Sequence, residues 1–221
     1  AGPAQFEPLK TEMLASLTTV DGDVLTPPSK VFSTLAWSSI LSVGGSVGFI
    51  LGHSLLGPLF NLFFPPALSL LLVLFIIPYA AYVRLGKGDL CDMEARMLLL
   101  LLSMVTGVSV GSSLHCLFIS SEPLEVLAPA AAACAFAYGS GTLGSNRASL
   151  LAAATGASFI AQILYGVAVG LTGSFLFVSL LHSIGIFVLV QLMFKYVTSS
   201  TPTTHPHMLA YISVFAFVKV L

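Results

Sequence analysis

The sequence predicts an all-α fold, a polytopic membrane bundle of about seven transmembrane helices with the last one short or truncated. Hydrophobic residues make up 57% of the 221-residue chain and charged residues 8%, whereas charged residues make up about 25% of a soluble domain. Long apolar stretches recur between short polar segments, as expected of helices that cross a bilayer. The first 30 residues lack such a stretch, so we expect a polar arm outside the bilayer over residues 1–30 and a bundle over residues 31–221.

The arm itself carries apolar residues at helical spacing, namely Leu9, Met13, Leu14 and Leu17. This spacing is typical of a short amphipathic helix on a membrane surface or against a partner protein. The sequence begins at Ala1 without an initiator methionine, which we interpret as a removed presequence or an altered start. A polar arm becomes ordered when something holds it, so we expect other subunits of a membrane complex to contact residues 1–30.

The first two spans are defined by glycines and prolines. The first, residues 31–52, carries glycines four residues apart, which form a helix face that a neighbouring helix can approach closely. These are Gly44, Gly48 and Gly52. Gly57 and Pro58 interrupt the apolar stretch that follows, and Pro65 and Pro66 place a boundary before the second span, residues 66–83.

The third span, residues 97–119, holds 23 consecutive residues without Asp, Glu, Lys or Arg. Its Gly107 and Gly111 are spaced for close helix packing. We expect the fourth to seventh spans at residues 126–144, 148–171, 174–197 and 207–221. The last of these is too short to cross the bilayer unless the chain continues beyond Leu221.

The basic residues predict one orientation of the bundle. If the N-terminus lies on the cytoplasmic or matrix side, seven basic residues lie on that side, and only Lys219 lies on the other, together with Glu122 and Glu125. Membrane proteins carry more Lys and Arg in the loops on the cytoplasmic side than in those on the opposite side. The asymmetry therefore supports this orientation. The seven are Lys10, Lys30, Arg84, Lys87, Arg96, Arg147 and Lys195.

Catalytic motifs are weak, and we expect no enzyme, no catalytic residue, no metal and no cofactor. Gly107 to Gly111 match the G-x-S-x-G pattern, but within an apolar helix this pattern favours packing over a nucleophile. Ser140 with His182 as an intramembrane serine protease pair is a weaker alternative. His205 and His207 lie in a predicted loop and lack a third ligand for a metal. With a net charge of −1 and no basic stripe, nucleic acid is not an expected partner.

Polar residues inside the apolar spans are the candidate functional residues, because such groups face a bundle interior or a water-filled path. The candidate polar path comprises Gln162, His182, Gln191 and Tyr211. Hydrogen bonding between helices is the alternative explanation for the same residues.

The order of several short motifs resembles the Bax inhibitor family of membrane proteins, as a divergent member. They are Thr26-Pro27-Pro28-Ser29-Lys30-Val31-Phe32, Glu94-Ala95-Arg96, Thr106-Gly107-Val108-Ser109-Val110-Gly111, Ser145-Asn146-Arg147 and Phe187-Val188-Leu189. The resemblance implies seven helices with the last in the centre of the bundle. It also implies a calcium leak across an organelle membrane and regulation of apoptosis.

The chain differs from that family at one functional feature, and this difference leaves two hypotheses about its function. The family's acidic pair falls at Gln191 and near Tyr211, neither of which is an acid. The first hypothesis is therefore a family-type ion transport protein with a neutral path. The alternative is an accessory subunit of a mitochondrial respiratory or ATP synthase assembly. Both place the protein in the bilayer of an organelle, the mitochondrial inner membrane or the endoplasmic reticulum.

Overall fold

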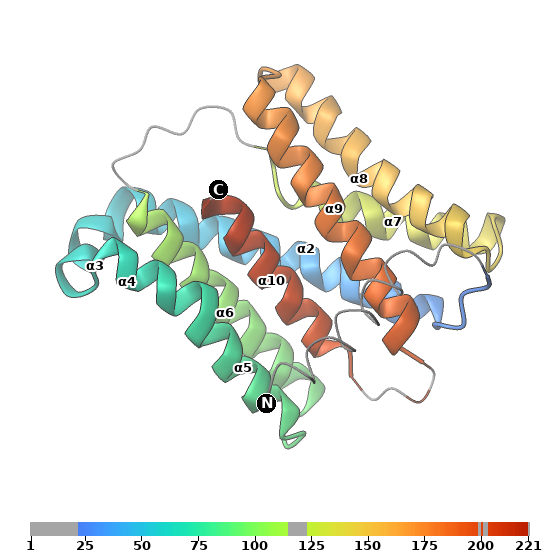
Figure 1. The fold of residues 1–221 in the computed structure, drawn as a ribbon, viewed down its shortest axis with the longest axis horizontal. Helices are drawn as coiled ribbons and strands as arrows, with labels where there is room; N and C mark the ends of the chain where they lie inside the picture. Colours follow the sequence, from blue (N-terminus) through green and yellow to red (C-terminus); the bar gives the residue numbers. More distant parts are fainter. Residues whose placement is uncertain (1–21, 115–122, 199, 201–202, 221) are drawn as a thin grey trace, which may run out of the picture.

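A computed structural model describes residues 22–114, 123–198, 200 and 203–220 (Figure 1). The all-α prediction is confirmed, because these residues form helices and contain no strand. The elements are α2 (Pro28–Leu51), η1 (Gly52–Leu56), α3 (Gly57–Phe63), α4 (Pro66–Leu71), η2 (Leu72–Ile76), α5 (Ile77–Gly86), α6 (Asp92–Ser113), α7 (Leu127–Thr142), α8 (Arg147–Val169), α9 (Gly173–Tyr196) and α10 (His205–Val220), where η marks a π-helical turn. The helix predicted over Leu9 to Leu17 and the end of the third predicted span lie outside the described residues.

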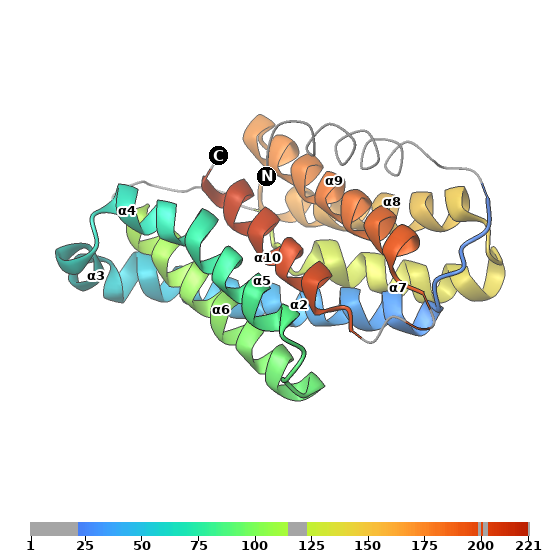
Figure 2. The same cartoon turned by 60° about the horizontal axis from the view of Figure 1, so that its bottom comes forward.

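The long helix α2 joins the two halves of the bundle. It packs against α6 on one side and against α7 on the other, and α4, η2 and α5 lie beside α6, whereas α8 and α9 lie beside α7 (Figures 1 and 2). The last helix, α10, lies between the halves and contacts α2, α5, α6 and α9. α10 is therefore enclosed by helices from both halves.

The tightest contact in the bundle is the crossing of α2 and α6. A Cβ atom at Gly48 would overlap the backbone carbonyl of Met104, and one at Gly107 would overlap the carbonyl of Gly45. Gly52 and Gly111 meet the opposite backbone in the same way, and Gly44 faces the Leu100 side chain. Only glycine leaves room for backbones at this separation.

Both π-helical turns stand just before a proline, Pro58 after η1 and Pro78 after η2. A proline inside a helix clashes with the carbonyl four residues earlier and lacks an N–H donor. A wider turn relieves that clash, so the helix continues. The predicted interruption at Gly57 and Pro58 is therefore wrong, because α3 follows directly from η1, whereas Pro66 begins α4 as the sequence predicts.

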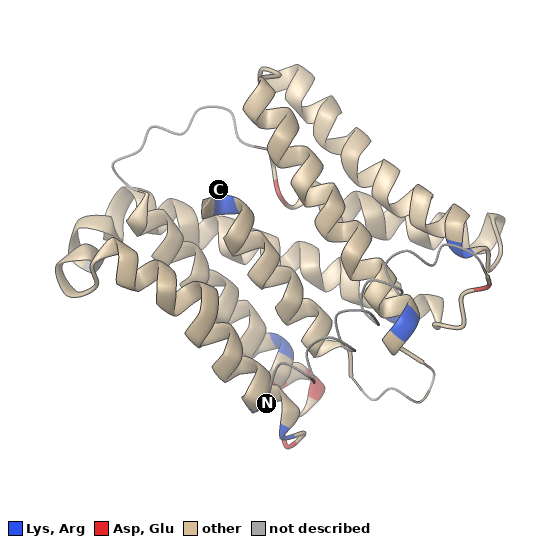
Figure 3. Ribbon diagram, viewed as in Figure 1, with Lys and Arg blue, Asp and Glu red and all other residues tan. Residues whose placement is uncertain are grey.

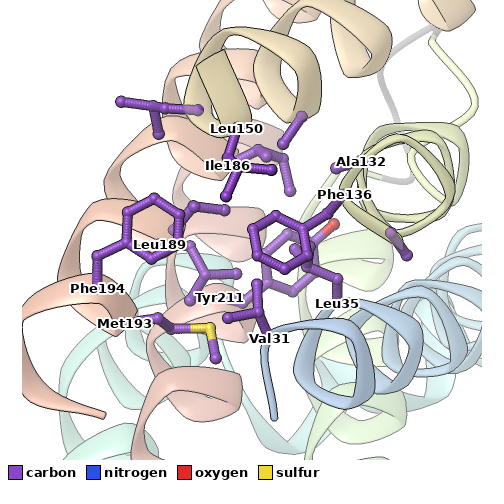
Figure 4. Close-up of a cluster of buried hydrophobic side chains, with 14 of the residues drawn as sticks. Val31, Leu35, Ala132, Phe136, Leu150, Ile186, Leu189, Met193, Phe194 and Tyr211 are labelled. Carbon is purple, nitrogen blue, oxygen red and sulfur yellow. The ribbon is translucent and has the colours of Figure 1, made fainter. Parts of the chain in front are cut away.

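The main apolar cluster lies where α2, α7, α8, α9 and α10 meet (Figure 4). Leu35, Phe136, Ile186 and Met193 are fully buried in it. Their burial on three different helices, α2, α7 and α9, packs the second half of the bundle closely against α2.

Among the residues that the structure describes, five helical runs, not the predicted seven, are long and apolar enough to cross a membrane. They are residues 28–59, 66–86, 92–113, 147–169 and 173–196. The helices α7 and α10 have 16 residues each, which gives a length of about 24 Å and falls short of the ~30 Å hydrocarbon layer.

We predict that Gly107→Ala destabilises the protein by about 1–3 kcal/mol, because the added methyl group separates two backbones. Gly156→Ala is the matched control, since a Cβ at Gly156 in α8 meets no other atom within 4 Å. The control should be neutral or stabilise by up to about 1 kcal/mol. Equilibrium unfolding in a mixed detergent checks this, and equal effects at both positions would contradict the close crossing.

Candidate functional site

Charged residues gather at one end of the helices (Figure 3). The start of α2, α6 and α8 and the end of α5 and α9 lie at this end (Figure 1). Five of the six described basic residues assigned to one side of the bilayer lie within these helices, and the sixth, Lys87, directly follows α5. Lys10, the seventh, lies outside the described residues. We call this the charged end of the bundle.

The loop between α5 and α6, residues 87–91, is the most charged surface of this end. An ion pair between Arg84 and Asp89 closes it, and Gly88 adopts a φ of 70°, which favours glycine. The Arg84 guanidinium holds the pKa of the Asp89 carboxyl below its ordinary value of 3.8. The pair is therefore present at neutral pH and is lost only as the pH falls through that lowered pKa.

A second set of contacts ties the start of α10 to the charged end. His205 Nε2 lies 3.0 Å from Asp92 Oδ1, and Arg96 Nε lies 2.8 Å from Asp92 Oδ2. The Arg96 guanidinium in turn stacks over the Trp37 ring at 4.9 Å. The predicted loop position of His205 is wrong, because His205 is the first residue of α10 and its side chain is only 5% exposed.

The segment before α2 is fixed to the turn between α7 and α8. Val24 N–H donates to Ser145 O at 2.8 Å, and Arg147 N–H donates to Gly22 O at 3.1 Å. Beside it lies a cavity of about 260 Å³, whose lining includes Val24, Ser145 and Phe136. The described residues of its wall carry only backbone groups, apolar side chains and hydroxyl groups, so they offer no general acid or general base.

At the opposite end, an ion pair is buried within the bundle. Lys219 Nζ lies 3.0 Å from Glu125 Oε1, with side chains 10% and 3% exposed. Ser46 Oγ donates to Glu125 Oε2 at 3.2 Å, and the Lys219 ammonium lies 4.4 Å from the centre of the Phe49 ring. The pair joins α10 to the segment before α7 and to α2. The carboxylate of Glu125, a residue predicted from the sequence to lie on the far side of the bilayer, therefore points into the bundle.

Two of the four candidate path residues, Gln191 and Tyr211, form hydrogen bonds with different helices. The Gln191 side chain is fully buried and its Oε1 accepts from Arg147 Nε at 3.0 Å, while the Tyr211 hydroxyl lies 2.9 Å from Ser42 Oγ. The Arg147 guanidinium also stacks over Phe194 at 5.6 Å. These contacts are hydrogen bonds between helices, which is the alternative that the sequence left open.

The other two candidates, Gln162 and His182, lie on the neighbouring helices α8 and α9 and are both buried. Gln162 Nε2 donates to Ser158 O of its own helix at 3.3 Å. Gln191 lies nine residues further along α9, about 13 Å from His182 along the helix axis. The structure therefore groups Gln162 with His182 and places Gln191 and Tyr211 with other partners.

Sequence reasoning missed the partners of Glu125 and Gln191. Each pair joins residues far apart in the chain, 94 residues for Glu125 and Lys219 and 44 for Arg147 and Gln191. The sequence offered one signal, which is that Glu125, Arg147 and Lys219 are isolated charges in or beside apolar spans. A charge in such a position has a polar partner when it is buried.

A family model described as "Interactor of ZYG-11" matches residues 3–221. No curated protein and no solved structure matches the chain.

This match corrects the family assignment and what depended on it. The resemblance to the Bax inhibitor family is wrong, because the model that covers the chain is that of another family. The calcium leak, ion transport and apoptosis regulation were inferred from that resemblance, so these predictions are wrong as well. The match does not support a mitochondrial accessory subunit either. One of the motifs that carried the resemblance, Thr106 to Gly111, is explained by helix packing, since Gly107 and Gly111 face α2 and Ser109 is buried.

We predict that Glu125→Gln or Lys219→Met alone destabilises the protein by about 3–5 kcal/mol, because each leaves a buried charge without its partner. The double variant should lie within about 1 kcal/mol of the original chain, since both charges are then removed. A double-mutant cycle of unfolding free energies measures the coupling. Additive single effects would show that the two side chains do not interact.

Proposed function

The chain belongs to the family of interactors of ZYG-11, and from this premise we propose that it is a membrane-embedded helical protein that binds a ZYG-11 protein at its charged end. The observation that carries the proposal is the family match over residues 3–221. The role is one of binding, and the proposal assigns the chain no catalysis of its own.

The exposed surface of the bundle supports placement in a membrane. In the run of residues 66–86, only 11% of the most apolar window is buried. Phe75 and Tyr79 are each 70% exposed, and Leu71 is 49% exposed. An apolar surface of this extent is unfavourable in water, and lipid chains would cover it.

The shorter helices fit this placement because other helices cover them. The direction of the chain also requires α7. Because α6 and α8 both run away from the charged end, α7 must return the chain to that end between them (Figure 1). Within α10, the buried Met208, Ile212 and Phe215 face neighbouring helices. We therefore propose that α7 and α10 complete the bundle inside the bilayer.

The charged end is the surface that the proposal assigns to the partner. It carries exposed groups of both signs, including Lys87, Asp89 and Glu94. The Arg84–Asp89 pair and Gly88 hold the α5–α6 loop in one conformation, which lowers the entropy lost on binding. The excess of Lys and Arg at this end supports its placement on the cytoplasmic side, where it would meet a soluble partner. The predicted organelle stays a prediction.

We predict that Lys87→Glu weakens binding to ZYG-11 about fivefold or more, because an exposed charge at a contact surface is reversed. Leu171→Glu places the same carboxylate in the exposed turn between α8 and α9 and should leave binding unchanged. The measurement is titration of purified ZYG-11 onto the chain in lipid nanodiscs. Absence of binding by the original chain would refute the proposal, and loss with Leu171→Glu alone would move the binding surface to the opposite end.

We further predict that Cys91, which is exposed at the charged end, reacts with a membrane-impermeant maleimide from one side of a vesicle only. The test uses a chain in which the other two cysteines, Cys116 and Cys134, are serine. In the same background with Cys91→Ser, a cysteine substituted at Leu171 should react from the opposite side. Labelling of both positions from the same side would contradict the membrane placement.

A further inference from the structure

Five polar side chains meet in the interior between α8 and α9. Ser158, Gln162, Ser179, His182 and Ser183 are all buried, with exposed fractions between 0% and 7%. The surrounding positions of both helices are mostly apolar, so this cluster is a polar island within the bundle. We call it the α8–α9 polar cluster.

The packing of the two helices places these residues opposite one another. Near the turn that joins α8 to α9, a Cβ at Gly166 would meet the ring of Phe175, and the Tyr165 and Phe175 rings lie 6.4 Å apart. In antiparallel helices, one turn away from such a contact on each helix places Gln162 across from Ser179. A second turn places Ser158 across from Ser183, beside His182.

Several polar atoms of the cluster have no hydrogen-bond partner within the described part of the chain. They are Ser158 Oγ, Gln162 Oε1 and Ser179 Oγ. His182 has at most the Val178 carbonyl of its own helix as a partner, which leaves at least one ring nitrogen unbonded. A single unpartnered buried polar group lowers the ratio of folded to unfolded protein by roughly five- to 150-fold. Four such groups in one place therefore point to a ligand that bonds them.

The chemistry of these atoms selects the ligand. Gln162 Oε1 only accepts hydrogen bonds, whereas the two hydroxyl groups donate and accept, so an anion would be repelled by the amide oxygen. None of these four side chains carries the negative charge that a buried cation would need as a partner. A neutral molecule with two donors and two acceptors fits all four groups, and water is the smallest of this class.

We propose that the α8–α9 polar cluster is a binding site for internal water, which links Ser158 and Gln162 of α8 to Ser179 and His182 of α9. This site lies beyond the binding role at the charged end and does not depend on it. Water bonded on both helices would hold the hairpin together inside an apolar bundle, where direct side-chain bonds do not reach across.

The experiment is a water-selective NOE measurement on the full chain in bicelles with ¹³C-labelled histidine and isoleucine methyl groups. The His182 ring is identified by loss of its signal in His182→Phe. A bound water gives a cross-peak between the carbon-bound ring protons of His182 and water. The Ile186 methyl group is the control, because Ile186 is fully buried one turn away in the apolar cluster, and it should give none. Absence of the His182 cross-peak would overturn the proposal.

A second measurement uses Gln162→Leu, which keeps the side-chain volume and removes the amide. If water is bound, the variant lowers the ratio of folded to unfolded protein about tenfold and abolishes the His182 cross-peak. If the cluster is dry, the variant raises that ratio, because an unpartnered amide is removed, and this result would also overturn the proposal. If the variant does not fold, the cross-peak of the original chain alone decides.

Discussion

The architecture depends on the backbone contact between α2 and α6. At this crossing Gly48 and Gly107 each face a carbonyl of the other helix, and no side chain fits between the two backbones. Dispersion contacts and close packing hold the helices together at such a crossing. In the proposed membrane placement the hydrophobic effect would add little between them. Because α2 also packs against α7, its fixed position relative to α6 sets the space that α10 occupies between the two halves.

Electrostatics give the bundle two unlike ends. At the charged end, ion pairs such as Arg84–Asp89 are exposed and add little to stability, but they shape a polar surface. At the other end, Lys219 and Glu125 are buried together, so neither charge is available to a partner and each requires the other. This difference is why the binding role is assigned to the charged end, and why the buried pair is assigned a structural one.

Much of the fold was predictable from local patterns, and little of the polar interior was. Glycine spacing identified Gly44, Gly48, Gly52, Gly107 and Gly111 as packing positions, because residues four apart share a helix face regardless of the partner. The pairing of Arg147 with Gln191 and the inward position of Glu125 required the three-dimensional arrangement of helices that are distant in the chain. The mistaken family resemblance has the same origin, since motifs such as Thr106 to Gly111 reflect what any closely packed helix needs.

The central claim is that a membrane-embedded helix bundle binds a ZYG-11 protein through its charged end. Hydrogen–deuterium exchange of the chain in nanodiscs, with and without ZYG-11, tests it most directly, because the amide protons report which surface the partner covers. The account predicts slower exchange in residues 86–91 on addition of ZYG-11 and no change in the turn at residues 170–172. Unchanged exchange throughout the chain, or protection confined to the opposite end, would contradict it.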